Sequence, residues 1–174
     1  MAGQSNFANS STLYFDFWWY IMAIFLVQHG QAASAEKDLQ RPLTALGIKE
    51  SSHVASVAEY YMVIVDEIVH SDKLRARQTA EIFATKLKPA RGLREDTSLS
   101  PEGNVEQFAA TLKQGENTLV VGHLPFLQRL LSLLITGNTS HEIMKFQNSG
   151  IICLEPASES GRWQIKWTLS RHIS

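Results

Sequence analysis

The sequence is poor in cysteine and has no excess of charge of either sign. Cys153 is the only cysteine among 174 residues, so no disulfide can form within the chain. This fits a reducing compartment and predicts a cytoplasmic protein. Cys153 lies in an apolar run over residues 151–154, which indicates a buried side chain rather than a catalytic thiol. The formal net charge is −1 and lysines and arginines form no cluster, so nucleic acid is not an expected ligand.

Metal-ligand motifs and a membrane anchor are also missing. The six histidines show no HExxH or other ligand spacing, so no metal site is expected. Residues 13–27 are almost wholly apolar, but this run is short for a membrane span. Residues 1–21 contain no lysine or arginine to form the basic start of a signal peptide. We therefore expect no membrane association and interpret residues 1–21 as an N-terminal extension of uncertain role.

Apolar runs and helical patterns alternate along the rest of the chain. The sequence predicts strands over residues 23–27, 63–69, 118–121, 151–155 and 163–169, and helices over residues 45–61, 74–87, 105–113 and 124–135. Residues 88–104 are expected to form a polar loop that contains proline. The first helix is expected to begin after an N-cap at Thr44 and to bury one apolar face, formed by Leu46, Val54, Val57 and Tyr61. This order predicts a three-layer α/β/α fold with a mostly parallel central sheet.

Side chains suited to chemistry follow three of the predicted strands. His29 follows the first strand, Ser71 and Arg75 follow the second, and His123 follows the strand at residues 118–121. Ligands of such sheets bind beyond the carboxyl ends of the strands, so we expect these residues to lie at one edge. Arginine offers a planar donor fork that matches phosphate oxygens, and a neutral imidazole can attack phosphorus. The sequence therefore predicts phosphoryl chemistry at this edge.

The same positions lie in motifs that resemble the histidine phosphatase superfamily. That superfamily ends its first strand with Arg-His-Gly, and residues 28–30 here are Gln-His-Gly. After its second strand it has Ser-Pro, two variable residues and Arg-Ala-x-Gln-Thr, and residues 71–79 here are SDKLRARQT. A Gly-His pair ends a later strand, as at residues 122–123. The stretches RPLT at 41–44 and LSPEGNV at 99–105 resemble the small phosphohistidine phosphatases of the SixA type.

The resemblance implies a role for each site residue. His29 would be the nucleophile that carries the phosphoryl group as a phosphohistidine intermediate. Arg75 and His123 would bind the phosphoryl group and stabilise the transition state, as catalytic residues beside His29. Gln28 and Arg41 would be further phosphate contacts. No metal or other cofactor is implied.

The resemblance also implies a fold and a substrate class. Residues 22–174 would form a single histidine phosphatase domain with a phosphoglycerate mutase-like fold. The expected substrate is phosphohistidine on a partner protein, such as a histidine phosphotransfer domain in signal transduction, with inorganic phosphate as the product. Two alternatives stay open: a phosphatase for small phosphoesters, and a phosphate-binding pseudoenzyme.

Two residues depart from the pattern of the superfamily. Gln28 stands where the superfamily has arginine, which favours the pseudoenzyme or a slower enzyme. A lost charge-assisted hydrogen bond costs roughly 1.5–3 kcal/mol, or about tenfold to a hundredfold in rate. The missing cation should also let the pKa of the nucleophile rise, so we expect activity to need a higher pH than in an arginine-containing relative. Asp72 replaces a proline, and Glu95, Asp96 and Glu102 are the nearby candidates for a general acid.

Overall fold

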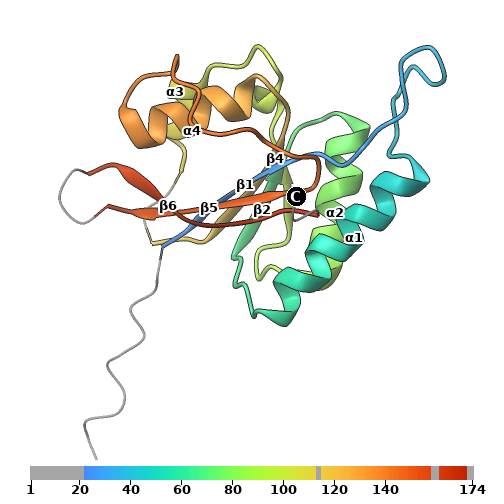
Figure 1. Cartoon of the computed structure of the whole chain (residues 1–174), viewed down its shortest axis with the longest axis horizontal. Coiled ribbons are helices and arrows are strands. Elements are labelled where there is room, and N and C mark those ends of the chain that lie inside the picture. Colours follow the sequence, from blue (N-terminus) through green and yellow to red (C-terminus); the bar gives the residue numbers. More distant parts are fainter. Residues whose placement is uncertain (1–21, 113–114, 158–160, 172–174) are drawn as a thin grey trace, which may run out of the picture.

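The centre of the molecule is a mixed sheet, seen in a computed structural model that describes residues 22–112, 115–157 and 161–171. Within these residues the sheet has six strands in the order β3-β2-β4-β1-β5-β6 (Figure 1). Their bounds are Ile24–Gln28 for β1, Glu67–His70 for β2, Leu93–Glu95 for β3, Thr118–Gly122 for β4, Ile151–Pro156 for β5 and Trp163–Leu169 for β6. The pairs β3-β2, β2-β4 and β4-β1 are parallel, and β1-β5 and β5-β6 are antiparallel. The sheet is therefore mostly parallel, as predicted.

Helices cover both faces of this sheet. The helices α1 (Ala45–Tyr60) and α2 (Leu74–Leu87) lie on one face, and α3 (Val105–Ala109) and α4 (Phe126–Thr136) lie on the other (Figure 1). Side chains alternate across a strand. Phe25 and Val27 of β1 therefore join the core under α1 and α2, while Ile24 and Leu26 join the core under α3 and α4. This confirms the three-layer α/β/α fold. The predicted extension at residues 1–21 lies outside the described residues.

Helix α1 begins where the sequence predicts but buries a different face. The side chain of Thr44 accepts a hydrogen bond from the backbone N–H of Gly47 at 3.0 Å, which confirms the N-cap. The predicted apolar face is wrong in part: Val54 is buried, but Leu46 is 48% exposed and Tyr61 is 71% exposed. The buried positions of α1 are Gly47, Ser51, Val54, Ala55 and Ala58. These mostly small residues let α1 approach its neighbours closely. A hydrophobic pattern does not predict where such close packing requires small side chains.

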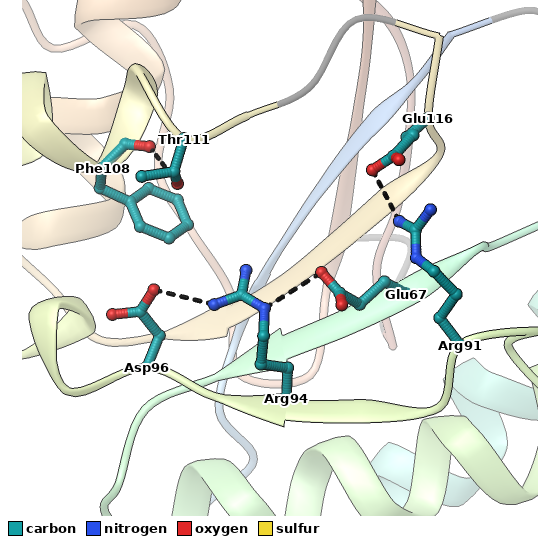
Figure 2. A network of polar contacts seen from close by, with 7 residues as sticks. All are labelled: Glu67, Arg91, Arg94, Asp96, Phe108, Thr111 and Glu116. Atoms are coloured by element: carbon teal, nitrogen blue, oxygen red, sulfur yellow. Dashed lines mark hydrogen bonds and ion pairs between the residues drawn. The ribbon is translucent and has the colours of Figure 1, made fainter.

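The predicted loop at residues 88–104 contains a strand and a 3-10 turn, η1 (Thr97–Leu99). Strand β3 is only three residues long and exposed, so it has no alternating apolar pattern to reveal it. It pairs with β2 through the backbone and through Arg94, which contacts Glu67 at 3.2 Å and Asp96 at 3.1 Å (Figure 2). Such exposed ion pairs contribute about 0–1 kcal/mol each, so the backbone ladder is the main tie. The predicted helix at 105–113 is also shorter than expected, because α3 ends at Ala109.

The expectation for Cys153 is confirmed. Its side chain is buried in the core, and burial raises the pKa of its thiol to about 12, so the reactive thiolate is suppressed. Among the described residues, no helix has both the length and the apolar character that crossing a membrane requires.

Gly47 gives a test of how closely α1 packs. A β carbon at this position would press against the carbonyl oxygen of Gln31, which is backbone and has little freedom to move. Alanine is favoured over glycine in a helix by about 1 kcal/mol, so propensity alone predicts that Gly47→Ala stabilises the protein. We expect it instead to lower the free energy of unfolding by about 1–3 kcal/mol in urea denaturation. The exposed residue His53 provides the control, since His53→Ala should be neutral or stabilising. A more stable Gly47→Ala protein would contradict the observed packing.

Candidate active site

The strand-end residues meet at one cavity of about 450 Å³. The cavity is lined by Gln28, His29, Gln31, Ala32, Arg41, Arg75, Pro101, His123, Leu124 and Asn148. All five residues to which the resemblance assigns a role are in this set, whereas Ser71, the other predicted strand-end residue, is not. The rings of His29, at the end of β1, and His123, at the end of β4, have their centres 5.0 Å apart. The parallel pairing of β1 with β4 and of β4 with β2 brings these strand ends together.

His29 is held with one ring nitrogen available for reaction. Its Nδ1 lies 2.7 Å from the carbonyl oxygen of Gly30, which only accepts hydrogen bonds, so Nδ1 carries the proton. The Nε–H of Arg75 donates to Nε2 of His29 at 3.2 Å, so Nε2 presents a lone pair. Burial, followed by the charges of Arg75 and Arg41, lowers the pKa of His29 to about 4 despite the opposing hydrogen bond to Gly30. The imidazole is therefore neutral near pH 7.

A second set of hydrogen bonds fixes the backbone around His29. The N–H of Gly30 donates to the hydroxyl of Thr79 at 3.0 Å, and that hydroxyl donates to the carbonyl of Arg75 at 2.7 Å. One side chain thus joins the turn after β1 to the first turns of α2. On the other side, the amide of Asn148 donates to the carbonyl of His29 at 2.7 Å. These contacts restrain the backbone of His29 from two directions.

Asn148 was not predicted from the sequence as a site residue. The residue belongs to no motif of the resemblance and follows no predicted strand. The signal that could have found it is topological: β5 runs antiparallel to β1, so residues just before β5 lie beside the end of β1. Asn148 forms an isolated bridge with Gln28 for this reason. A polar side chain immediately before an antiparallel neighbour of the first strand is therefore a site candidate.

His123 is buried more deeply than His29. Its Nε2 lies 2.9 Å from the hydroxyl oxygen of Ser71, which follows β2. Its Nδ1 is buried and has no hydrogen-bond partner among the described residues. Burial is the largest cause that lowers the pKa of His123 to about 3, and the nearby charges of His29 and Arg75 add to it. His123 is therefore also neutral near pH 7, with one nitrogen unsatisfied.

The cations of the cavity come from Arg75 and Arg41. Burial and the positive charge of Arg41 both lower the pKa of Arg75, a sign that the two guanidinium groups repel each other. Arg41 has a backbone φ of 50° and donates from Nε to the carbonyl of Ala33 at 3.2 Å. The segment that carries it is tied down by the N–H of Leu43, which donates to the side chain of Gln78 at 2.8 Å. An anion between the two arginines would relieve their repulsion.

None of the three carboxylates considered as a general acid lines the cavity. Glu95 is exposed on β3, and Glu102 lies outside the lining residues although its neighbour Pro101 is among them. Asp96 caps η1 by accepting a hydrogen bond from the N–H of Ser98 at 3.0 Å. In the part of the chain that the structure describes, no group of three histidine, cysteine, aspartate or glutamate side chains could hold a metal ion. The lining is thus rich in donors and carries no carboxylate.

The fold and the cavity define an α/β protein with a cationic cavity at the strand ends of a mostly parallel sheet. The sequence model of the histidine phosphatase superfamily (branch 1) matches residues 24–100. The chain is 32% identical over 155 residues to the phosphohistidine phosphatase SixA of Escherichia coli (strain K12), which covers 86% of this chain and 94% of that relative. The chain belongs to the histidine phosphatase superfamily, and the resemblance inferred from its motifs is confirmed.

Further relatives agree with this assignment. An uncharacterised protein of Picosynechococcus sp. is 32% identical over 76% of this chain and 84% of its own length. The structure of the protein histidine phosphatase SixA complexed with tungstate has a TM-score of 0.75 and 31% identity, covering 86% of this chain and 97% of that one. The alpha-ribazole phosphatase of Shigella flexneri has a TM-score of 0.71 at 17% identity, covering 88% of this chain and 98% of that one, and shows the fold alone. The relationship to SixA supports phosphatase activity.

The low pKa values of His29 and His123 predict that stability falls in acid. Unfolded histidine takes up a proton near pH 6.5, while folded His29 does so only near pH 4, so the unfolded state binds more protons in between. Stability is therefore lost as the pH falls from about 6.5 to about 4 for His29 and to about 3 for His123, by roughly a few kcal/mol for each histidine. Urea denaturation of the wild type and of His29→Asn across this range measures the difference. The exposed residue His53 is the control: His53→Asn should keep the wild-type pH dependence, and a His29→Asn protein that also keeps it would contradict the prediction.

Proposed function

We propose that the chain is a metal-independent phosphatase that uses His29 as its nucleophile and phosphohistidine on a partner protein as its substrate. The observation that carries this proposal is the state of His29: neutral, with the lone pair of Nε2 facing the Nε–H of Arg75 at 3.2 Å. A phosphoryl group that enters between them would meet a nucleophile and a cation together. The relationship to SixA, which is named a phosphohistidine phosphatase, supports the substrate class.

The proposed reaction has two displacements at phosphorus. In the first, the lone pair of His29 Nε2 forms an N–P bond while the N–P bond of the substrate breaks; the second ring nitrogen of the substrate is protonated, so the electron pair stays on a neutral leaving imidazole. In the second, water attacks the phosphoryl group on His29, the N–P bond to Nε2 breaks, and inorganic phosphate leaves. Arg75, Arg41 and His123 would hold the phosphoryl oxygens during both steps. The hydrogen bond from Nδ1 to Gly30 keeps Nε2 as the attacking atom.

A neighbouring groove supports a protein as the substrate. This groove, of about 700 Å³, adjoins the cavity because both are lined by Gln28, Leu124 and Asn148. Its other lining residues are Gln128, Glu142, Lys145, Phe146, Gln147 and Arg171. A phosphohistidine side chain in the cavity would bring its own polypeptide over this groove, whose polar and charged rim suits a solvated protein surface. In this proposal residues 22–174 act as one domain, in the cytoplasm and in signal transduction.

The primary test is phosphate release from a histidine phosphotransfer domain that carries phosphohistidine. We expect the wild type to release inorganic phosphate and His29→Ala to lose this activity by at least about a thousandfold, because the covalent route is removed. His53→Ala, which changes an exposed histidine of α1, is the matched control and should keep full activity. Phosphate release that persists in His29→Ala would contradict the nucleophile.

Substrate comparison separates the proposal from its alternatives. Free phosphohistidine, the phosphorylated domain and small phosphoesters are compared by kcat/KM, and the domain should be preferred. Lys145→Glu, which reverses a charge of the groove, should lower kcat/KM for the domain more than for free phosphohistidine. Preference for a phosphoester would identify a small-molecule phosphatase. Binding of phosphorylated domain without phosphate release from any substrate would identify a phosphate-binding protein.

Gln28→Arg tests the effect of the missing arginine. A cation at Gln28, which lines the cavity, should raise kcat/KM for free phosphohistidine by about tenfold or more. It should also lower the pKa of His29 below about 4, so that activity extends to more acidic pH. Gln128→Arg makes the same chemical change in the groove outside the cavity and should do neither. An unchanged rate and an unchanged pH profile in Gln28→Arg would show that the lost charge does not limit this enzyme.

A further inference from the structure

A chain of hydrogen bonds leads from His123 to a carboxylate outside the cavity. The hydroxyl of Ser71 donates to Oδ1 of Asp72 at 3.1 Å. The same hydroxyl oxygen lies 2.9 Å from Nε2 of His123. Ser71 has one hydroxyl proton, and a carboxylate only accepts, so that proton is directed to Asp72. The hydrogen bond to His123 must then come from an Nε2–H, which fixes the tautomer of the neutral ring.

This tautomer leaves Nδ1 of His123 without a proton. Nδ1 is buried and has no hydrogen-bond partner among the described residues. A neutral His123 in this state has no further N–H to offer to a phosphoryl oxygen. It can donate there only after it takes up a second proton at Nδ1 and becomes an imidazolium. The arrival of a dianion in the cavity favours that protonation, since opposite charges at close range favour the charged form.

We propose that Asp72 is a positioning residue that acts through Ser71, holding Nε2–H of His123 in place and stabilising the imidazolium that forms when a phosphoryl dianion enters the cavity. This inference rests on the proposed function, because it concerns the same cavity. The superfamily pattern has proline at this position, so the carboxylate is a feature of this chain and of any relative that shares Asp72.

The charges around His123 make Asp72 the favourable partner. The titratable and charged groups that act on His123 are His29 at the end of β1, Asp72 and Lys73 between β2 and α2, and Arg75 in α2. Among them Asp72 alone raises the pKa of His123, while the other three lower it. Partial burial disfavours the ionised form of Asp72, but hydrogen bonds from Lys73 and Ser71 outweigh this and lower its pKa. Lys73 contacts the other carboxylate oxygen, Oδ2, at 3.0 Å, so Oδ1 stays directed to Ser71.

The test measures proton uptake when tungstate binds, by calorimetry in buffers of different ionisation enthalpy. Tungstate is a tetrahedral dianion that does not titrate between about pH 6 and about pH 9, so proton uptake reports a protein group. We expect the wild type to take up close to one proton at about pH 7. Asp72→Asn should take up clearly less and bind tungstate about threefold to tenfold more weakly. Asp72→Glu should restore most of both values.

Matched controls distinguish an effect transmitted from Asp72 through Ser71 to His123 from a general effect of charge or of folding. Glu81→Gln removes the same charge from the exposed face of α2, where Glu81 contacts Arg77 at 3.8 Å, and should leave uptake and affinity unchanged. Ser71→Ala should reproduce the loss, and Ser71→Ala combined with Asp72→Asn should lose no more than Ser71→Ala alone. Wild-type proton uptake in Asp72→Asn, or additive losses in the double variant, would overturn the inference.

The same measurement tests the role of Asp72 separately from the proposed phosphatase. Tungstate binding by the wild type without proton uptake would overturn the role of Asp72 and leave the proposed phosphatase in place. Absence of tungstate binding by the wild type would overturn the oxyanion site itself, and the role of Asp72 with it. Phosphate release from the phosphorylated domain then reports on the proposed function independently.

Discussion

The site depends on the hydrogen bond between Nδ1 of His29 and the carbonyl of Gly30, because this contact makes Nε2 the free nitrogen. Three elements hold the Gly30 peptide in place. Thr79 of α2 accepts from its N–H, and the hydroxyls of Ser51 and Ser149 would lie 2.6 and 3.1 Å from any β carbon at this position. Glycine is therefore favoured at this position, because its neighbours leave little room for a side chain. The packing of α1, α2 and the segment before β5 around Gly30 thus determines how the ring of His29 is oriented.

Electrostatics then set the charge of that imidazole. Burial lowers the pKa of both cavity histidines, so the site holds neutral rings beside the guanidinium groups of Arg75 and Arg41. Neutral His29 keeps its lone pair, which nucleophilic attack requires. Neutral His123 has no proton on Nδ1, and in the proposed mechanism it takes one up when a phosphoryl dianion binds. The two histidines would then have opposite protonation states, and of the two His123 is the one connected, through Ser71, to a carboxylate.

The parts of the fold and of the site that could be predicted are those that have a recognisable pattern in the sequence. His29, Arg75 and His123 follow recognisable buried strands, and the rule that ligands bind at strand ends brought them together correctly. Asn148 precedes a strand whose antiparallel direction was not predicted, so its position beside the end of β1 could not be predicted either. The buried face of α1 was mispredicted in part because a hydrophobic pattern favours burial of Leu46 over burial of Gly47. In the structure Gly47 is buried and Leu46 is exposed, because the close packing of α1 requires a small side chain there. Strand β3 left no pattern at all, since its three residues are exposed.

The exchange of arginine for Gln28 fits this charge arrangement. Burial and the positive charge of Arg41 already lower the pKa of Arg75, and a third guanidinium in the same cavity would add to that repulsion. A glutamine amide avoids the repulsion but gives up charge on the phosphoryl oxygens. In the proposed mechanism the remaining attraction falls on Arg75, Arg41 and a protonated His123. In that mechanism, fewer arginines in the cavity make phosphoryl binding depend more on the protonation of His123. The carboxylate of Asp72 would therefore have its largest effect in a chain that lacks the arginine at position 28.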